Sequence, residues 1–452
     1  MSVDTQQQKF QHMTTMPVDR LVRQLALPTV ISMLITAIYN MADTFFVGQL
    51  GASAQGAIGV VYSLMMIIQA IGFGFGHGSG NYISRKLGEQ NVLEAAQMAV
   101  VGFVSSFFTG LLVLLAGLLF MPQIALILGS TLTILPYAEE YMFFILLAAP
   151  FYASSLTLNN QLRLQGCAQR ALLGIGTGTL LNCALDPLLI FGFHMGVTGA
   201  GLSTLISQIV SFLILFYQTQ HSDAVSLSLR LYRPYKGLLM AIVQGGLPSV
   251  SRQGIHSLAN ILLSHAMKFY GDQFFAAMTI VVRLSNLLFA SVAGIGQGFQ
   301  PVCGFNYGAR LYSRVHSAYI YTQRLALTTL SIATLVLLIF TPQIIAFFSQ
   351  SPQVIALSVQ AQRWQCISIP FMGFCIIVSM LLQNINHYKQ ATVMALSRSG
   401  IFFIPAILLM PSCLGMLGVM LAQPVADFCS FALALPMQRR VMRQLKQPDA
   451  IS

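Results

Sequence analysis

Charged residues are scarce in this chain. Of its 452 residues only 8% are Asp, Glu, Lys or Arg, whereas 56% are hydrophobic. A soluble domain carries roughly a quarter charged residues, so this composition excludes an ordinary soluble protein. The mean hydropathy of +0.73 instead indicates a polytopic membrane protein.

Several sequence motifs are also missing. The chain has no P-loop and no catalytic constellation or cofactor motif, so we expect neither ATP hydrolysis by that route nor an enzyme, and no cofactor. Its seven cysteines and the embedded His77, His256 and His265 lack metal-ligand spacing, so no metal centre is predicted. The polar residues 1–18 lack the apolar core of a cleavable signal peptide.

Long apolar segments are what the sequence does contain. Twelve of them reach the roughly 20 residues that a membrane-spanning helix needs. We therefore expect an all-α polytopic membrane protein with twelve transmembrane helices. Their approximate limits are 21–48, 55–80, 94–120, 136–160, 170–192, 197–218, 241–268, 274–300, 316–340, 355–383, 391–411 and 415–436.

Basic residues give the formal net charge of +11, and most of them fall in alternate loops and at both ends of the chain. Loops near residues 121–135 and 341–354 carry none. By the positive-inside rule we expect both termini to be cytoplasmic. The expected location is the inner membrane of a prokaryote. A nucleic-acid surface would gather its bases on one face of a soluble fold, so we expect no nucleic-acid partner.

An internal repeat becomes visible when the sequence is laid over itself with Pro28 on Pro248. Six spans are an even number, so both copies enter the membrane in the same orientation, as two parallel six-helix repeats around a central cavity. The positions matched by this one ungapped shift include Leu27-Pro28-Thr29-Val30 with Leu247-Pro248-Ser249-Val250; Gly74, Gly76 and Gly78 with Gly294, Gly296 and Gly298; and Pro122-Gln123-Ile124 with Pro342-Gln343-Ile344.

The repeat also predicts the domain organisation. We expect a cytoplasmic N-terminal tail, a six-helix lobe, a cytoplasmic linker, a second six-helix lobe and a basic cytoplasmic tail. Pro28 and Pro248 lie inside the first span of each lobe, where a missing N–H and a ring clash bend a helix. We interpret them as hinges, although a static kink fits equally well. The expected limits are 1–18, 19–220, 221–240, 241–437 and 438–452.

Carboxylates within the spans are the candidate functional residues, because ionisable groups at membrane depth are costly and usually handle ions or substrate. Asp43 lies four residues after Tyr39, and Asp186 four residues after Asn182, so each pair shares a helix face. Both acids fall in the first copy, and their counterparts in the second are apolar. For Asp43 the alternative is that it only bonds a neighbouring helix.

Other charges within the spans are harder to interpret. We read Asp427 in the last span as a polar contact. Arg252 and Arg283 either extend toward the membrane surface or face the cavity. The glycine series from Gly72 to Gly80 lacks the context of a phosphate-binding loop, so it predicts close helix packing instead.

Several motifs together resemble the multidrug and toxic compound extrusion (MATE) family, over essentially the whole chain. They are Leu25-Ala26-Leu27-Pro28, Tyr39-Asn40-Met41-Ala42-Asp43, the segment Asn182 to Pro187, the run Gly294-Ile295-Gly296-Gln297-Gly298-Phe299-Gln300-Pro301, and Gly304-Phe305-Asn306-Tyr307-Gly308-Ala309.

The resemblance implies a secondary active antiporter that exports amphipathic, often cationic drugs in exchange for protons or sodium. The DinF-like branch is the nearer one, because at the carboxylate positions of the NorM branch this chain has His256 and Cys375. In the DinF-like branch ion coupling is attributed to a cluster in the first lobe. The matching residues here are Tyr39, Asp43, Tyr141, Asn159, Asn182, Asp186 and Thr204.

The coupling ion and the substrate stay open at this point. Two nearby carboxylates can bind a proton and titrate as a coupled set, but the oxygens of Asp43, Asn182, Asp186 and Thr204 would also suit sodium. We expect a monomer in the lipid bilayer that takes small amphipathic substrates. A flippase or exporter of a lipid-linked or specific metabolite is the alternative.

Overall fold

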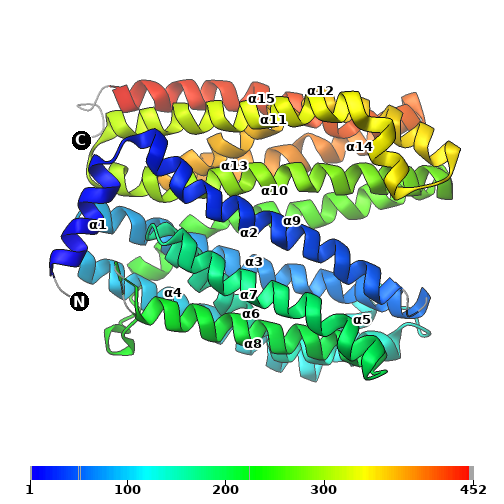
Figure 1. Ribbon diagram of the computed structural model, residues 1–452, viewed down its shortest axis with the longest axis horizontal. Coiled ribbons are helices and arrows are strands. Elements are labelled where there is room, and N and C mark those ends of the chain that lie inside the picture. The colour runs from blue at the N-terminus through cyan, green and yellow to red at the C-terminus, as the bar shows by residue number, and fades with distance from the viewer. Residues whose placement is uncertain (1–2, 49, 51, 223, 226, 447–452) are drawn as a thin grey trace. The chain divides into compact units, whose positions relative to one another are not determined.

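In the computed structural model, every regular element of the described part is a helix (Figure 1). The structure describes residues 3–446 except 49, 51, 223 and 226, and it describes no side chains for residues 3–5, 39–48 and 52–55. The first half contains α1 (Val3–Thr15), α2 (Val18–Gly48), α3 (Ala52–Gly88), α4 (Val92–Leu119), α5 (Met121–Ile127), α6 (Leu135–Leu164), α7 (Ala168–Pro187), the π-helical turn η1 (Leu188–Gly192) and α8 (Gly196–Gln220).

The second half repeats this order. It contains the short 3₁₀ helix η2 (Leu229–Leu231), α9 (Lys236–Lys268), α10 (Asp272–Gly308), α11 (Tyr312–Phe348), α12 (Pro352–Asn384), α13 (Tyr388–Leu396), the π-helical turn η3 (Ser397–Ile401), α14 (Phe403–Leu414) and α15 (Met416–Lys446). The all-α prediction is therefore confirmed, and each of the twelve expected spans coincides with a helix or with a helix interrupted by a π turn.

Eleven of the described helical segments are long and apolar enough to cross a membrane. The twelfth expected span, α9, is 33 residues long but does not reach the same hydropathy. Its ionisable residues, among them Arg252 and His256, explain the difference. The sequence did not predict α1, which begins within the supposed polar tail; Lys9 Nζ donates to the Gly166 carbonyl at 3.0 Å and so attaches α1 to the turn after α6.

Two compact units make up the chain. The first contains residues 1–16 and 31–250, and the second contains residues 17–30 and 251–452. The units thus cross the expected lobe limits, since the beginning of α2 belongs to the second unit and the beginning of α9 to the first. The two changeovers, after Val30 and after Val250, fall at matched positions of the repeat, and each comes shortly after a proline.

Backbone conformation follows the repeat as well. Gln90 and Arg310 correspond in the two copies, and both end a long helix with positive φ, +58° and +59°. Gly166 and Asn386 form a second corresponding pair, with φ of +78° and +66°. Left-handed conformation is uncommon for residues other than glycine, so its recurrence at matched positions supports a duplicated architecture.

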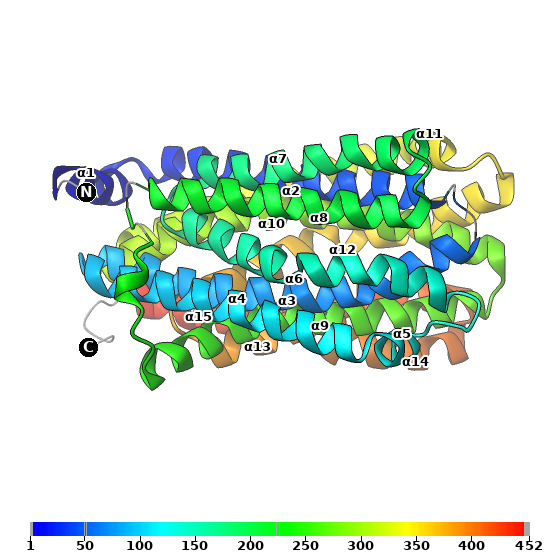
Figure 2. The same cartoon turned by 90° about the horizontal axis from the view of Figure 1, so that it is seen from below.

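One central helix organises each unit. In the first unit α6 contacts α3, α4 and α8, and α7 runs beside α8 (Figure 2). In the second unit α12 contacts α10, α11 and α15. Among the candidate spans, the most apolar stretches of these two helices are the most buried, 72% in α6 and 78% in α12. The other spans of each unit therefore pack around a helix that is largely shielded from lipid.

The glycine series of α3 packs helices closely, as predicted. Gly72, Gly76 and Gly80 lie one turn apart and face α6, where a Cβ would approach side chains such as Asn160 to within 3 Å. Gly78 lies on another face, and a Cβ there would collide with the carbonyl oxygen of Ile242 in α9. No room for a phosphate exists at these contacts.

Candidate functional site

A buried polar cluster lies at the end of α7 in the first unit. The Asp186 side chain is fully buried, and the Asn182 amide, one turn earlier, donates to its Oδ1 at 3.1 Å. The same amide donates to the hydroxyl of Ser203 on α8. Since residues four apart share a helix face, the sequence places both polar groups toward α8.

The end of α7 is shaped by Pro187. A proline has no N–H for the helical ladder, and the chain continues as the π-helical turn η1, the kind of turn that is frequent at functional sites. Gly199 of α8 packs against this turn so closely that a Cβ would lie 2.9 Å from the Leu189 carbonyl. This close approach brings Ser203 within reach of Asn182.

Two more predicted residues lie around the cluster. Thr204 follows Ser203 on α8 and is 2% exposed, and its hydroxyl donates to the Ala200 carbonyl at 3.1 Å. Tyr141 of α6 is buried in the apolar cluster that also contains Ile190 of η1 and Ala200. Asn182 and Asp186 are thus hydrogen-bonded at the end of α7, Thr204 lies beside Ser203 on α8, and Tyr141 lies in the apolar cluster that includes η1.

Asn159 does not join them. Its amide donates to the carbonyl of Ala171, near the start of α7, at 2.9 Å. With a rise of 1.5 Å per residue, it lies about 27 Å along α6 from Tyr141. Asn159 therefore fastens the opposite end of α7, and any part it has in ion coupling is at a distance from Asp186.

Tyr39 and Asp43 fall in α2, but their side chains lie outside the described residues. Of the two carboxylates expected from the sequence, Asp186 is therefore the one whose side chain is described. Within that part no group of three or more His, Cys, Asp or Glu side chains is placed to share a metal ion.

Sequence reasoning missed two contributors to buried polar sites. Ser203 stands beside the predicted Thr204, but its contact with Asn182 depends on how α7 and α8 pack. Arg398 falls within the expected span 391–411, about 15 Å along the helical segment that begins at Tyr388, and its contact likewise depends on how helices pack. Its Nε donates to Asp427 Oδ1 at 2.6 Å.

Asp427 is buried and makes several polar contacts, as the sequence indicated. Besides Arg398, the Ser368 hydroxyl donates to Oδ2 at 3.0 Å and the Gln423 amide donates to Oδ1 at 2.8 Å. Arg283 is exposed on α10, and Arg252 is partly buried on α9. Neither of these arginines lines the pocket around His256 and Arg398.

Comparison with known proteins agrees with the repeat. The MatE family model matches residues 28–188 and again residues 248–408, once for each copy. The chain is 25% identical over 422 residues to the multidrug export protein MepA of Staphylococcus haemolyticus, covering 92% of this chain and 93% of that protein. Both copies of the model begin at the proline of the first span.

Solved structures share the fold over nearly the whole chain. One is a multidrug resistance MATE family transporter of the MOP superfamily in an outward-facing conformation, with a TM-score of 0.90 and 25% identity, covering 95% of this chain and 97% of that one. Another is a crystal structure of MATE in complex with MaL6, with a TM-score of 0.92 and 24% identity, covering 97% and 99%. At 24% identity, the match with this second structure shows a shared fold alone.

Proposed function

This chain belongs to the MATE family of efflux transporters, and from that premise we propose that it exports amphipathic, often cationic compounds in exchange for protons. It is a multi-pass membrane transporter and not an enzyme. The proposal adds the direction of exchange, the coupling ion and the residues that bind it. The relative from S. haemolyticus is a multidrug export protein, which supports the substrate class.

The observation that carries the proton proposal is the burial of Asp186. Its side chain has no exposed surface, and Asn182 donates a hydrogen bond to it. Within α7 the nearest basic residue in sequence is Arg170, sixteen positions before Asp186, and no further Lys or Arg follows before Arg230. A carboxylate inside a membrane is costly as an anion, and binding a proton removes that charge.

The transport step follows from the hydrogen bonds. When Asp186 is ionised it accepts from the Asn182 amide, which also holds Ser203 on α8. Protonation weakens that acceptor, so the contact between α7 and α8 is free to rearrange. Asp43 on α2 would take part in the same step, and rearrangement of α2 would release bound substrate outward. Loss of the proton to the cytoplasm would restore the anionic site.

Pro28 and Pro248 are the proposed hinges of this step. Each stands just before the point where its helix passes from one compact unit to the other. A proline removes one helical hydrogen bond and favours bending. Bending there would let the rest of α2 or α9 move with its own unit.

Transport by the purified protein in liposomes tests the proposal. Uptake of a fluorescent cation should follow an imposed pH gradient in the absence of sodium, and Asp186→Asn should abolish it while the protein stays folded. Asp272→Asn is the matched control, because Asp272 is exposed in the first turn of α10. The control should transport like the wild type.

Other results would change specific parts of the proposal. Uptake under a sodium gradient at matched pH, without response to a pH gradient, would replace the proton by sodium at the same oxygen atoms. Full proton-driven uptake by Asp186→Asn would remove Asp186 from the coupling site. No uptake of any cation under either gradient would favour a lipid-linked or specific metabolite as substrate.

A further inference from the structure

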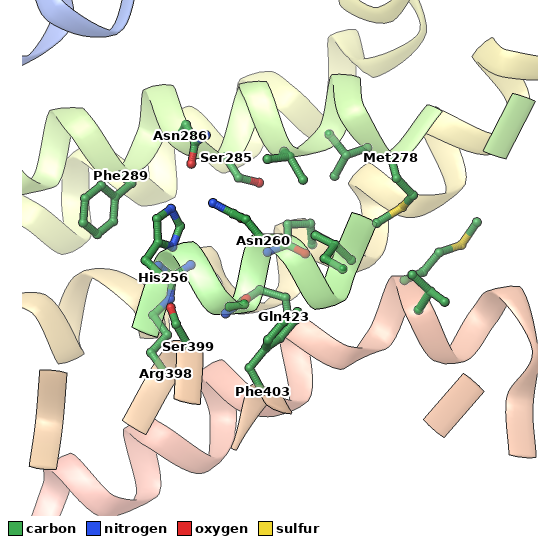
Figure 3. A pocket seen from close by; sticks show the side chains of 17 residues that line it. His256, Asn260, Met278, Ser285, Asn286, Phe289, Arg398, Ser399, Phe403 and Gln423 are labelled. Carbon is green, nitrogen blue, oxygen red and sulfur yellow. The ribbon is translucent and has the colours of Figure 1, made fainter. Parts of the chain in front are cut away.

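A polar pocket lies entirely within the second unit. Helices α9, α10, α12, α14 and α15 and the turn η3 contribute to its lining. Figure 3 shows His256 and Asn260 of α9 between Ser285 and Asn286 of α10 and the group that contains Arg398 and Gln423. No Asp or Glu lines it; all its lining residues belong to the described part of the chain.

Arg398 supplies the fixed positive charge of this pocket. Its Nε atom is bound to Asp427, whose side chain is 1% exposed, whereas the Arg398 side chain is 17% exposed. The acid therefore lies behind the guanidinium and holds it in place. Among the described contacts no further hydrogen bond engages Arg398, so its two Nη groups are available on the pocket side.

The geometry of a guanidinium selects the ligand. Its planar fork of N–H donors matches the two oxygens of a carboxylate better than any point charge does. Neutral hydrogen-bonding groups surround it, from Asn260, Ser285 and Asn286. A cationic ligand would find no carboxylate at the pocket surface. Arg398 would lie between it and Asp427 and would repel it.

Comparison of the two repeats shows that the first copy lacks the polar residues of this pocket. In the alignment that lays Pro28 on Pro248, Arg398 corresponds to Gly178 and Asp427 to Ser207. In the first unit those two positions are in close contact, since a Cβ on Gly178 would lie 3.0 Å from the Ser207 carbonyl. The polar residues of α10 that line the pocket, Ser285 and Asn286, correspond to Met65 and Met66.

The backbone around Arg398 is also exceptional. Arg398 belongs to η3, a π-helical turn between α13 and α14. Such turns are rare and occur frequently at functional sites. The guanidinium carbon lies 5.9 Å from the ring centre of Phe289 on α10, so an aromatic ring limits one side of the charge.

The rest of the lining is apolar and indicates the body of the ligand. Leu263, Met278, Val281, Phe403 and Met420 also line the pocket. The centres of water molecules can occupy about 70 Å³ there, several times the minimum for one water. The pocket as it stands therefore admits the acidic end and one small ring system or short chain of a ligand, not a large drug.

We propose that this pocket of the second unit binds small amphipathic carboxylates, with the Nη groups of Arg398 on the carboxylate and the apolar wall on the ring or chain. The proposal rests on the proposed function in one respect, since the bound carboxylate is taken to be a transported substrate. Asp427 acts as a positioning residue that orients the guanidinium.

Direct binding tests the site apart from transport. The full-length protein in lipid nanodiscs would be titrated with naphthylacetate, with naphthylacetamide and with naphthylmethyl-trimethylammonium, and partition into empty nanodiscs subtracted. Hydrogen bonds between ionised partners are stronger than those to neutral groups, so we expect naphthylacetate to bind at least tenfold more tightly than either of the other probes.

Variants identify the residue responsible. Arg398→Gln should remove the preference for the carboxylate, and Arg283→Gln, an exposed arginine of α10 outside the pocket, should keep it. If Arg398→Gln does not fold, Arg398→Lys replaces it: an ammonium can still pair with Asp427 but lacks the fork, so the carboxylate preference should shrink severalfold.

Equal or tighter binding of the ammonium probe by the wild type would overturn the proposal, as would an unchanged carboxylate preference in Arg398→Gln or Arg398→Lys. The two proposals fail separately. If the wild type shows no proton-driven transport but still prefers naphthylacetate, the proposed function is contradicted and the carboxylate site is not. If the wild type transports cations but does not prefer naphthylacetate, the carboxylate site is contradicted.

Discussion

At the scale of single residues, glycine positions decide how closely the helices approach. A Cβ on Gly298 of α10 would collide with the Cα of Ala26, and one on Gly294 would lie 2.5 Å from the Cα of Val30. The Thr29 hydroxyl donates to the Gly294 carbonyl at 2.6 Å across this contact. Because the neighbouring atoms are backbone atoms, they cannot move aside as a flexible side chain would.

Gly298→Ala should therefore destabilise the protein by ~1–3 kcal/mol, the usual cost of overpacking a close contact. Thermal unfolding of the detergent-solubilised protein measures the change. The matched control is Gly254→Ala on α9, where a Cβ would have no atom within 4 Å. Alanine is favoured over glycine in a helix by ~0.5–1 kcal/mol, so the control should be neutral or slightly stabilising. An equal effect of both substitutions would contradict the packing argument.

At the scale of elements, α2 and α9 are the helices that belong to both compact units. The beginning of α2 packs on α10 through Ala26 and Val30, and the beginning of α9 packs on α3 through Ile242 and Gly246. The repeat makes this exchange reciprocal. Each proline comes shortly before the residue at which its helix passes from one unit to the other. Each helix therefore lacks a backbone hydrogen bond near that residue.

Pro28→Ala and Pro248→Ala should slow transport and leave substrate binding intact, because alanine restores the helical hydrogen bond and stiffens the bend. A barrier higher by ~1.4 kcal/mol slows a step about tenfold, and we expect a fall of that order. Initial uptake rates and equilibrium binding would be measured side by side. Pro436→Ala, near the end of α15, is the control and should change neither quantity. A proportional loss of binding would show that the prolines shape the binding site instead.

At the scale of the whole molecule, the placement of charge predicts orientation in the membrane. Basic residues gather at the two ends of the chain and in alternate loops, and Arg439, Arg440 and Arg443 lie together on the last helix. Positive loops remain on the cytoplasmic side. Because the twelve expected spans are an even number, we expect both termini on the same, cytoplasmic side.

A fluorescent protein that matures only in the cytoplasm, fused after residue 452, should fluoresce, and the same protein inserted near residue 350 should not. Residue 350 follows α11, on the side where the loops carry no base. Expression of both fusions would be compared by immunoblot. Fluorescence of the inserted reporter with a dark C-terminal fusion would reverse the predicted orientation.

The sequence by itself determined the class, the spans and the duplication. A helix satisfies its own backbone hydrogen bonds in lipid, so twelve apolar segments predict twelve helices. The internal repeat, with Pro28 matched to Pro248, is visible in the sequence without any structure. Asn182 and Asp186 were found in the same way, because a spacing of four places two side chains on one helix face.

Tertiary structure decided which residues meet across helices. Ser203 reaches Asn182, and Arg398 reaches Asp427 over 29 positions, since both contacts depend on how two helices pack, which no local spacing encodes. The same reason explains why Asn159 lies far from Asp186. The exchange of the first half-helices between units likewise follows from packing of glycine faces on distant segments, which only the folded chain brings together.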